Sequence, residues 1–232
     1  MNEQLHPAYA GPAAAGALSE QRNRVLRNTY WLLALSLVPT VLGAWVGVTT
    51  GIVASMGVGI SMIVFLAGAF GFMFAIEKYK TSSAGVILLL GFTFFMGLML
   101  SRMLAAVLGF SNGASLVMYA FSGTAAVFFT MASLASVIKR DLSNMGKFLF
   151  VGAIMLLVAA VINIFVQSSA LMITVAVIAV GLFSAYMLYD LKRVIDGGET
   201  NYVSATLAIY LDVYNVFQSL LALLGIFGGE RD

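Results

Sequence analysis

Seven long apolar segments, separated by short polar breaks, constrain the fold of this chain more than any other feature. The length of each segment is close to the roughly 20 residues that an α-helix needs to cross a bilayer. Backbone polar groups must be paired inside lipid, so these segments must be helices. We predict an all-α integral membrane protein in which residues 1–28 are an N-terminal tail and residues 29–232 form one bundle of seven transmembrane helices. The predicted spans are Tyr30–Thr49, Ile52–Ile76, Ala84–Leu108, Ala114–Ile138, Phe148–Val166, Leu171–Leu191 and Tyr202–Phe227.

The amino-acid composition excludes several classes of function. Charged residues make up 9% of the chain, against about a quarter in soluble domains. Cysteine is absent, which excludes disulfides, thiolate metal sites and cysteine nucleophiles, and the one histidine, His6, lies in the tail. We found no Ser/His/Asp set and no phosphate-binding loop, so we expect no enzyme and no resident cofactor. A formal net charge of +2, with the basic residues at span ends, does not suggest a nucleic-acid partner.

The basic residues predict the orientation. Alternating the breaks puts ten of the twelve on one side, Arg231 on the other, and Arg102 inside a span near its outer end, where it can extend to the interface. This positive-inside bias places the N-terminus in the cytoplasm and the C-terminus outside. The tail lacks a signal-peptide pattern, and we interpret it as flexible, serving either as an inert leader or as a handle for a protease or partner. The ten are Arg22, Arg24, Arg27, Lys78, Lys80, Lys139, Arg140, Lys147, Lys192 and Arg193.

Glycines recur within the spans, Gly43 and Gly97 among them. Small residues let transmembrane helices approach closely. We interpret these glycines as packing contacts inside the bundle.

Two aspartates stand out because ionised carboxylates are expensive in a membrane. Asp212 lies about ten residues into the last segment, where insertion costs roughly 2.5 to 3.5 kcal/mol. Asp190 ends the sixth segment, where it either pairs with Lys192 or Arg193 or meets Asp212. If the last two spans are antiparallel neighbours, the carboxyl groups can share one proton and act as a pH-sensitive latch. The alternative for Asp212 is a purely structural hydrogen bond between helices.

Polar residues continue along the last segment. Asp212, Asn215 and Ser219 follow one another at i, i+3 and i+7, which is one face of a helix. We expect this polar stripe to point inward. Oxygen ligands suit Ca²⁺, which takes six to eight of them, better than zinc. Asp190 and Asp212 are therefore candidate ligands for a calcium ion in transit.

Several short segments form a specific pattern. They are residues 197–202 (GGETNY) and 205–217 near the C-terminus, the entry to the first span at 25–30 (VLRNTY), and 91–93 (GFT) and 163–165 (NIF). This pattern resembles that of the Bax inhibitor-1 family. The resemblance is to its bacterial, YccA-like branch, and it covers nearly the whole chain.

The resemblance implies more than the residues do by themselves. It implies that the last helix is central and wrapped by the other six. It implies that Asp190 and Asp212 are the pH sensor that closes the cytoplasmic side of a calcium leak in a bacterial inner membrane. YccA-like proteins are also modulators and slow substrates of the membrane protease FtsH, engaged through the N-terminal tail, so membrane lipids and FtsH are the expected partners.

Overall fold

A computed structural model describes residues 12–230, and every regular element in that range is a helix. Seven of the helices are long and apolar enough to cross a membrane, which confirms the predicted number of spans. The elements are α1 (Pro12–Thr50), α2 (Ile52–Ser55), α3 (Val58–Tyr79), α4 (Ser83–Leu108), α5 (Gly113–Val137), α6 (Met145–Val166), α7 (Ser169–Ile195) and α8 (Tyr202–Gly228).

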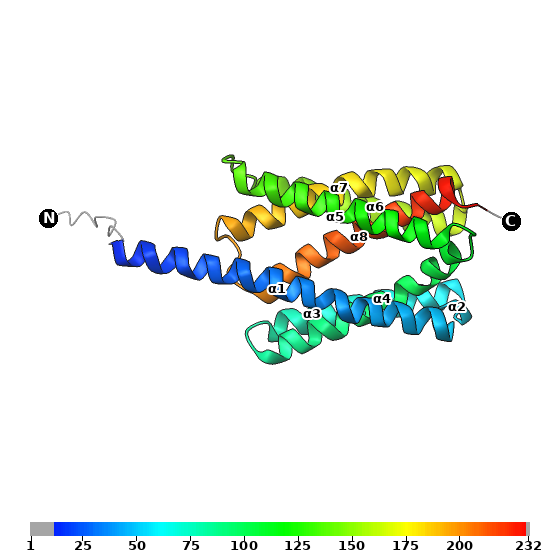
Figure 1. Cartoon of the computed structure of the whole chain (residues 1–232), viewed down its shortest axis with the longest axis horizontal. Coiled ribbons are helices and arrows are strands. Elements are labelled where there is room, and N and C mark those ends of the chain that lie inside the picture. The colour runs from blue at the N-terminus through cyan, green and yellow to red at the C-terminus, as the bar shows by residue number, and fades with distance from the viewer. Residues whose placement is uncertain (1–11, 231–232) are drawn as a thin grey trace.

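The helices form two groups with α8 between them. Figure 1 shows α1, α3 and α4 on one side and α5, α6 and α7 on the other. Helix α8 packs against α1, α3, α4, α5 and α7, whereas α6 packs against α7. Polar side chains on the buried face of α8, such as Thr206 and Asp212, are therefore placed among neighbouring helices.

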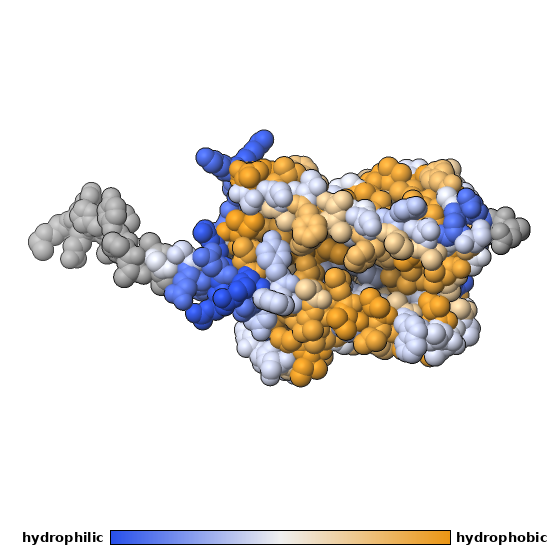
Figure 2. Space-filling model, viewed as in Figure 1, coloured by the Kyte–Doolittle hydropathy of each residue, from blue (hydrophilic) through white to orange (hydrophobic). Residues whose placement is uncertain are grey.

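The polar breaks alternate between the two ends of the bundle, as the predicted topology requires. The α3–α4, α5–α6 and α7–α8 connections lie at the end from which α1 emerges (Figure 1). We call this the basic end, because α1, these connections and the helix turns next to them carry the ten basic residues. Figure 2 shows hydrophilic residues gathered there and hydrophobic ones along the sides. Arg102 is exposed on α4, apart from the bundle interior.

Three predicted boundaries were wrong. Helix α1 begins at Pro12, so residues 12–28, predicted to be flexible, are helical, while residues 1–11 and His6 lie outside the described range. The second predicted span is split into α2 and α3 by an extended Met56, next to Gly57. Helix α7 continues beyond Leu191 to Ile195. The predicted boundaries follow the ends of the apolar runs, and a helix does not have to end where its apolar run stops.

Helices α1 and α4 cross at very short range. A Cβ atom built on Gly97 would lie 1.9 Å from the carbonyl oxygen of Thr40, and one on Gly43 would lie 2.0 Å from that of Phe94. Only glycine permits these backbones to come so close. The prediction that the span glycines make packing contacts is confirmed at both positions. It is wrong for Gly57, Gly59 and Gly71, to which it also applied, because a Cβ there would meet no atom within 4 Å.

Candidate functional site

The candidate site is built around the α7–α8 loop at the basic end. Gly197 has φ +81°, a left-handed conformation that glycine adopts without steric cost. Its N–H donates to the carbonyl of Val194 at 3.1 Å, and the N–H of Gly198 donates to that of Arg193 at 2.9 Å. This pair of bonds is a Schellman motif, which pairs the last carbonyls of a helix. Helix α7 therefore stops sharply and the chain turns towards α8.

Glu199 organises the middle of this loop. One of its carboxylate oxygens accepts hydrogen bonds from the N–H groups of Thr200 at 3.0 Å and Asn201 at 2.9 Å. The other oxygen forms an ion pair with Arg193 at 3.2 Å. The loop is thus tied back to the last turns of α7.

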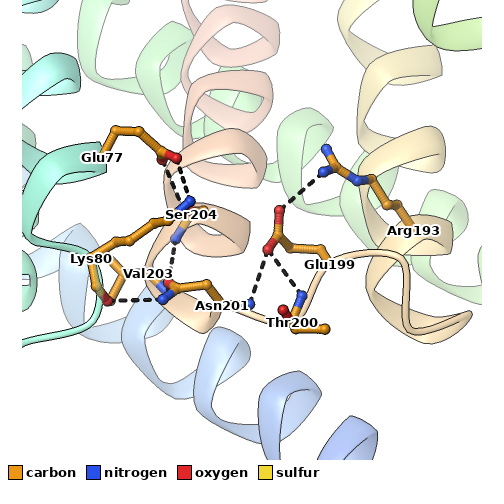
Figure 3. A network of polar contacts seen from close by, with 8 residues as sticks. All are labelled: Glu77, Lys80, Arg193, Glu199, Thr200, Asn201, Val203 and Ser204. Carbon is orange, nitrogen blue, oxygen red and sulfur yellow. Dashed lines mark hydrogen bonds and ion pairs between the residues drawn. The ribbon is translucent and has the colours of Figure 1, made fainter.

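Asn201 then starts α8 and links it to another part of the chain (Figure 3). Its side-chain oxygen accepts from the N–H groups of Val203 at 2.9 Å and Ser204 at 3.1 Å, the usual arrangement for an N-cap. Its amide nitrogen donates to the carbonyl of Lys80, in the α3–α4 turn, at 2.9 Å. One side chain therefore fixes both the start of α8 and its distance from the α3–α4 turn.

A polar cleft of about 280 Å³ opens between α3, α7 and α8 at this end. Lys192 pairs with Asp196, and Arg193 with Glu199, so neither forms the ion pair with Asp190 that the sequence left open. Asp190 lines the cleft instead. The charged residues around the cleft are Glu77, Lys80, Asp190, Arg193 and Glu199, and Ser204, Ala205 and Ala208 contribute the α8 side.

Asp190 and Asp212 meet behind the cleft. Their carboxyl groups are close enough to interact with each other. Asp212 is only 4% exposed, and its Oδ2 is the buried side-chain polar atom in residues 12–230 that lacks a hydrogen-bond partner. Asp190 is one turn or more inside α7, about 7 Å from the helix end at 1.5 Å per residue, because α7 continues to Ile195. The structure brings together the two acids that the sequence singled out.

The rest of the predicted stripe is not joined to this pair. Asn215 donates its amide to the carbonyl of Leu211, in its own helix, at 2.7 Å. Asn215 and Ser219 are both half-buried, whereas Asp212 is buried. Among the described residues there is no group of three or more acidic, histidine or cysteine side chains placed to hold a metal ion. Asp190 and Asp212 are thus two carboxylates without a third acidic side chain beside them among the described residues.

Two tyrosines that the sequence analysis did not single out fix α8 next to the pair. The hydroxyl of Tyr214 donates to the carbonyl of Met96 in α4 at 3.2 Å. The hydroxyl of Tyr210 shares a hydrogen bond with that of Thr40 in α1 at 2.9 Å. A buried tyrosine usually needs a hydrogen-bond partner for its O–H, and this rule could have identified both residues from the sequence. The sequence analysis also did not identify three charged residues of the site, because nothing near them in sequence shows which distant segment they contact. These residues are Glu77, Lys80 and Glu199.

Taken together, the fold and the site define a polytopic helical membrane protein with a buried carboxyl pair at the end of a polar cleft. The family model described as "Inhibitor of apoptosis-promoting Bax1" matches residues 22–229. The chain belongs to this family, the Bax inhibitor-1 family.

Bacterial relatives match over most of their length. An uncharacterized protein of Neisseria meningitidis serogroup A is 39% identical over 212 residues, covering 90% of this chain and 93% of the relative. The "Modulator of FtsH protease YccA" of Escherichia coli K12 is 36% identical over 203 residues, covering 88% and 90%. The same values hold for a protein of E. coli O6:H1 named "Inner membrane protein YccA".

Proposed function

We propose that this protein is a bacterial inner-membrane cation leak, with Ca²⁺ as the leading substrate, gated by protonation of Asp190 and Asp212. The observation that carries the proposal is the approach of the half-buried Asp190, which lines the polar cleft, to the buried Asp212, whose Oδ2 is unpaired. The positive-inside bias further supports a cytoplasmic N-terminus and a periplasmic C-terminus. On this orientation the cleft opens to the cytoplasm.

The chemistry of the pair provides a two-state element. Two buried carboxylates cannot both be ionised at contact without strong repulsion, so they hold one proton between them. At a separation of about 4 Å and an effective dielectric constant near 20, removing that proton costs about 4 kcal/mol in repulsion. That is enough to change the ratio of two conformations roughly a thousandfold. Separation of α7 from α8 would relieve the repulsion and open a path beside Asp212.

A cation can play the same part as the proton. Ca²⁺ prefers carboxylate oxygens, and a pair of carboxylates gives it a brief binding position while the rest of its shell stays hydrated. A site with few protein ligands favours passage over retention. The protonated pair and the cation therefore compete for the same two side chains.

The leak is tested with purified protein in liposomes loaded with a calcium-sensitive dye, over a series of pH values. We expect a pH-dependent flux in the wild type that changes its pH dependence or disappears in Asp190→Asn and Asp212→Asn. Asp141→Asn is the matched control, because Asp141 lies in the α5–α6 connection and its carboxylate is bonded locally to Ser143. A flux that is absent, or indifferent to both substitutions in the pair, would refute the leak.

The relationship to the E. coli protein named as a modulator of FtsH supports a second candidate function. We propose that this chain also engages an FtsH-type membrane protease through its N-terminal region, without any need for transport. Helix α1 extends beyond the bundle at the basic end, with Arg22, Arg24 and Arg27 on it (Figure 1). A partner at that membrane face can reach this extension without disturbing the spans.

Protein lifetime in cells that contain FtsH tests this second function. Deleting residues Met1 to Ala15 should lengthen the lifetime, because the deletion removes the end that a protease would engage. Asp212→Asn serves as the control and should leave the lifetime unchanged, since it alters only the pair. An unchanged lifetime after the deletion would remove the N-terminal region as a handle.

A further inference from the structure

The basic end contains a set of polar contacts that joins the α3–α4 turn to the start of α8. We call these residues, Glu77, Lys80, Asn201 and Ser204, the polar clasp (Figure 3). The Ser204 hydroxyl donates to one oxygen of Glu77 at 3.1 Å, and the Lys80 ammonium group pairs with the other. The amide of Asn201 donates to the Lys80 carbonyl. Two segments more than a hundred residues apart in sequence are thus joined by two hydrogen bonds, from Ser204 to Glu77 and from Asn201 to the backbone of Lys80, while the ion pair of Lys80 with Glu77 lies within one of the segments.

The position of the polar clasp gives it control over access to the acid pair. Glu77, Lys80 and Ser204 all line the cleft that Asp190 also lines. Helices α3 and α8 make few other contacts, because α3 packs mainly on α4. The distance between the α3–α4 turn and α8 at the cleft therefore depends largely on these polar contacts.

The contacts are of a kind that opens and closes. Side chains of Glu77 and Lys80 are partly exposed to solvent, so water can replace each hydrogen bond at little net cost. Helix α8 is held more firmly. Val203, Ala205 and Thr206 in its first turns are buried, and Tyr210 and Tyr214 further along are buried and bonded to α1 and α4. The α3–α4 turn, where residues 81–84 are exposed, is thus the more easily released side of the clasp.

We propose that the polar clasp is the outer gate of the cleft and that its opening controls the access of water and cations to Asp190. The physiological meaning of the gate rests on the proposed leak, but its effect on access does not. Opening also releases one carboxylate oxygen of Glu77 from Ser204, while the other oxygen stays paired with Lys80.

The absence of cysteine allows a direct test of access. A single Ala208→Cys substitution places a thiol in the cleft, and a small cationic thiosulfonate reagent measures how fast it is modified in the full-length protein. In this background Asn201→Asp keeps the oxygen that caps α8 but loses the donor to Lys80, and Ser204→Ala loses the bond to Glu77. Removing one such bond should raise the modification rate about twofold to tenfold.

The opposite end of α8 provides a matched control. There the amide of Asn112 donates to the carbonyl of Gly228 at 2.6 Å, and its oxygen accepts from the N–H of Glu230 at 3.2 Å. Asn112→Asp removes the same type of bond far from the cleft and should leave the rate at position 208 unchanged. A rate that is unchanged in both clasp variants, or that rises equally with Asn112→Asp, would overturn the gate.

Calcium flux in the same variants separates the gate from the leak. If the leak exists, Asn201→Asp and Ser204→Ala should increase the flux by a similar factor. Faster thiol modification in a protein that shows no flux at any pH would support the gate while refuting the leak. A flux that responds to Asp212→Asn but not to the clasp variants, at an unchanged modification rate, would refute the gate alone.

Discussion

Replacing Gly97 by alanine should destabilise the bundle strongly. The new Cβ would lie 1.9 Å from the Thr40 carbonyl oxygen, and ordinary contact begins at 3.4 Å, so α1 and α4 would have to separate by about 1.5 Å. The obstacle is backbone, which cannot rotate away as a side chain can. A shift of that size would also lengthen the 2.9 Å hydrogen bond between Thr40 and Tyr210 beyond its useful range.

The magnitude follows from these two effects. Overpacking of this kind costs about 1 to 3 kcal/mol, and the lost hydrogen bond adds about 1 kcal/mol. For a chain of this size each kcal/mol lowers the melting temperature by about 2 to 4 °C. The variant should therefore melt roughly 5 to 15 °C below the wild type.

Thermal unfolding in detergent, followed by the loss of helical circular dichroism, measures this difference. The control is Gly71→Ala in α3, where a Cβ would meet no atom within 4 Å. It should be neutral or slightly stabilising, because alanine favours helix over glycine by about 1 kcal/mol. Equal melting temperatures for the two variants would refute the close crossing of α1 and α4.

Three further predictions concern other parts of the molecule. Tyr214→Phe should lower the melting temperature by about 2 to 4 °C, because it removes a buried hydrogen bond worth about 1 kcal/mol. Gly197→Ala should cost about 1 to 2 kcal/mol in the same assay, because its φ of +81° is unfavourable for any residue with a Cβ. The N–H and hydroxyl of Ser143 lower the pKa of Asp141, so their stabilising contribution is present above the ordinary pKa of that carboxyl and lost as the pH falls through the lowered one. Ser143→Ala should raise the pKa of Asp141 towards its ordinary value in a carboxyl-carbon NMR titration.

Apolar length and charge placement were enough to predict the spans and the two acids. A run of about 20 apolar residues has few structural alternatives in a membrane, so all seven spans could be located. The cost of a carboxylate at membrane depth singled out Asp212 without any structural information. The contact between Asp190 and Asp212 was harder to predict, because it depends on where α7 ends. The end of the apolar run does not mark that position.

The extension of α1 illustrates a signal that apolar length does not capture. Pro12 followed by three alanines is a strong helix start, since proline suits the first turn and alanine favours the interior. An ion pair between Glu20 and Arg24, four residues apart, supports the polar turns that follow. The segment is too polar to count as a span and was therefore predicted to be flexible.

The polar clasp could not be predicted, for a different reason. Asn201 and Lys80 are 121 residues apart, and the bond between them depends on how α3 and α8 are arranged. The sequence around Asn201 predicts an N-cap, but it gives no information about the hydrogen bond that the same side chain donates to Lys80. Local patterns indicate what a residue does within its helix, and packing decides what else it touches.

The most direct test of the acid pair is whether it holds a proton. Infrared difference spectroscopy of the reconstituted protein, recorded across a pH titration, detects the protonated carboxyl group. We predict a protonated-carboxyl band, distinct from those of the other acids of the chain, that is lost as the pH rises, that Asp212→Asn removes and that Asp141→Asn retains. Identical carboxyl bands in the wild type and in Asp212→Asn across the titration would contradict the shared proton on which the proposed gating depends.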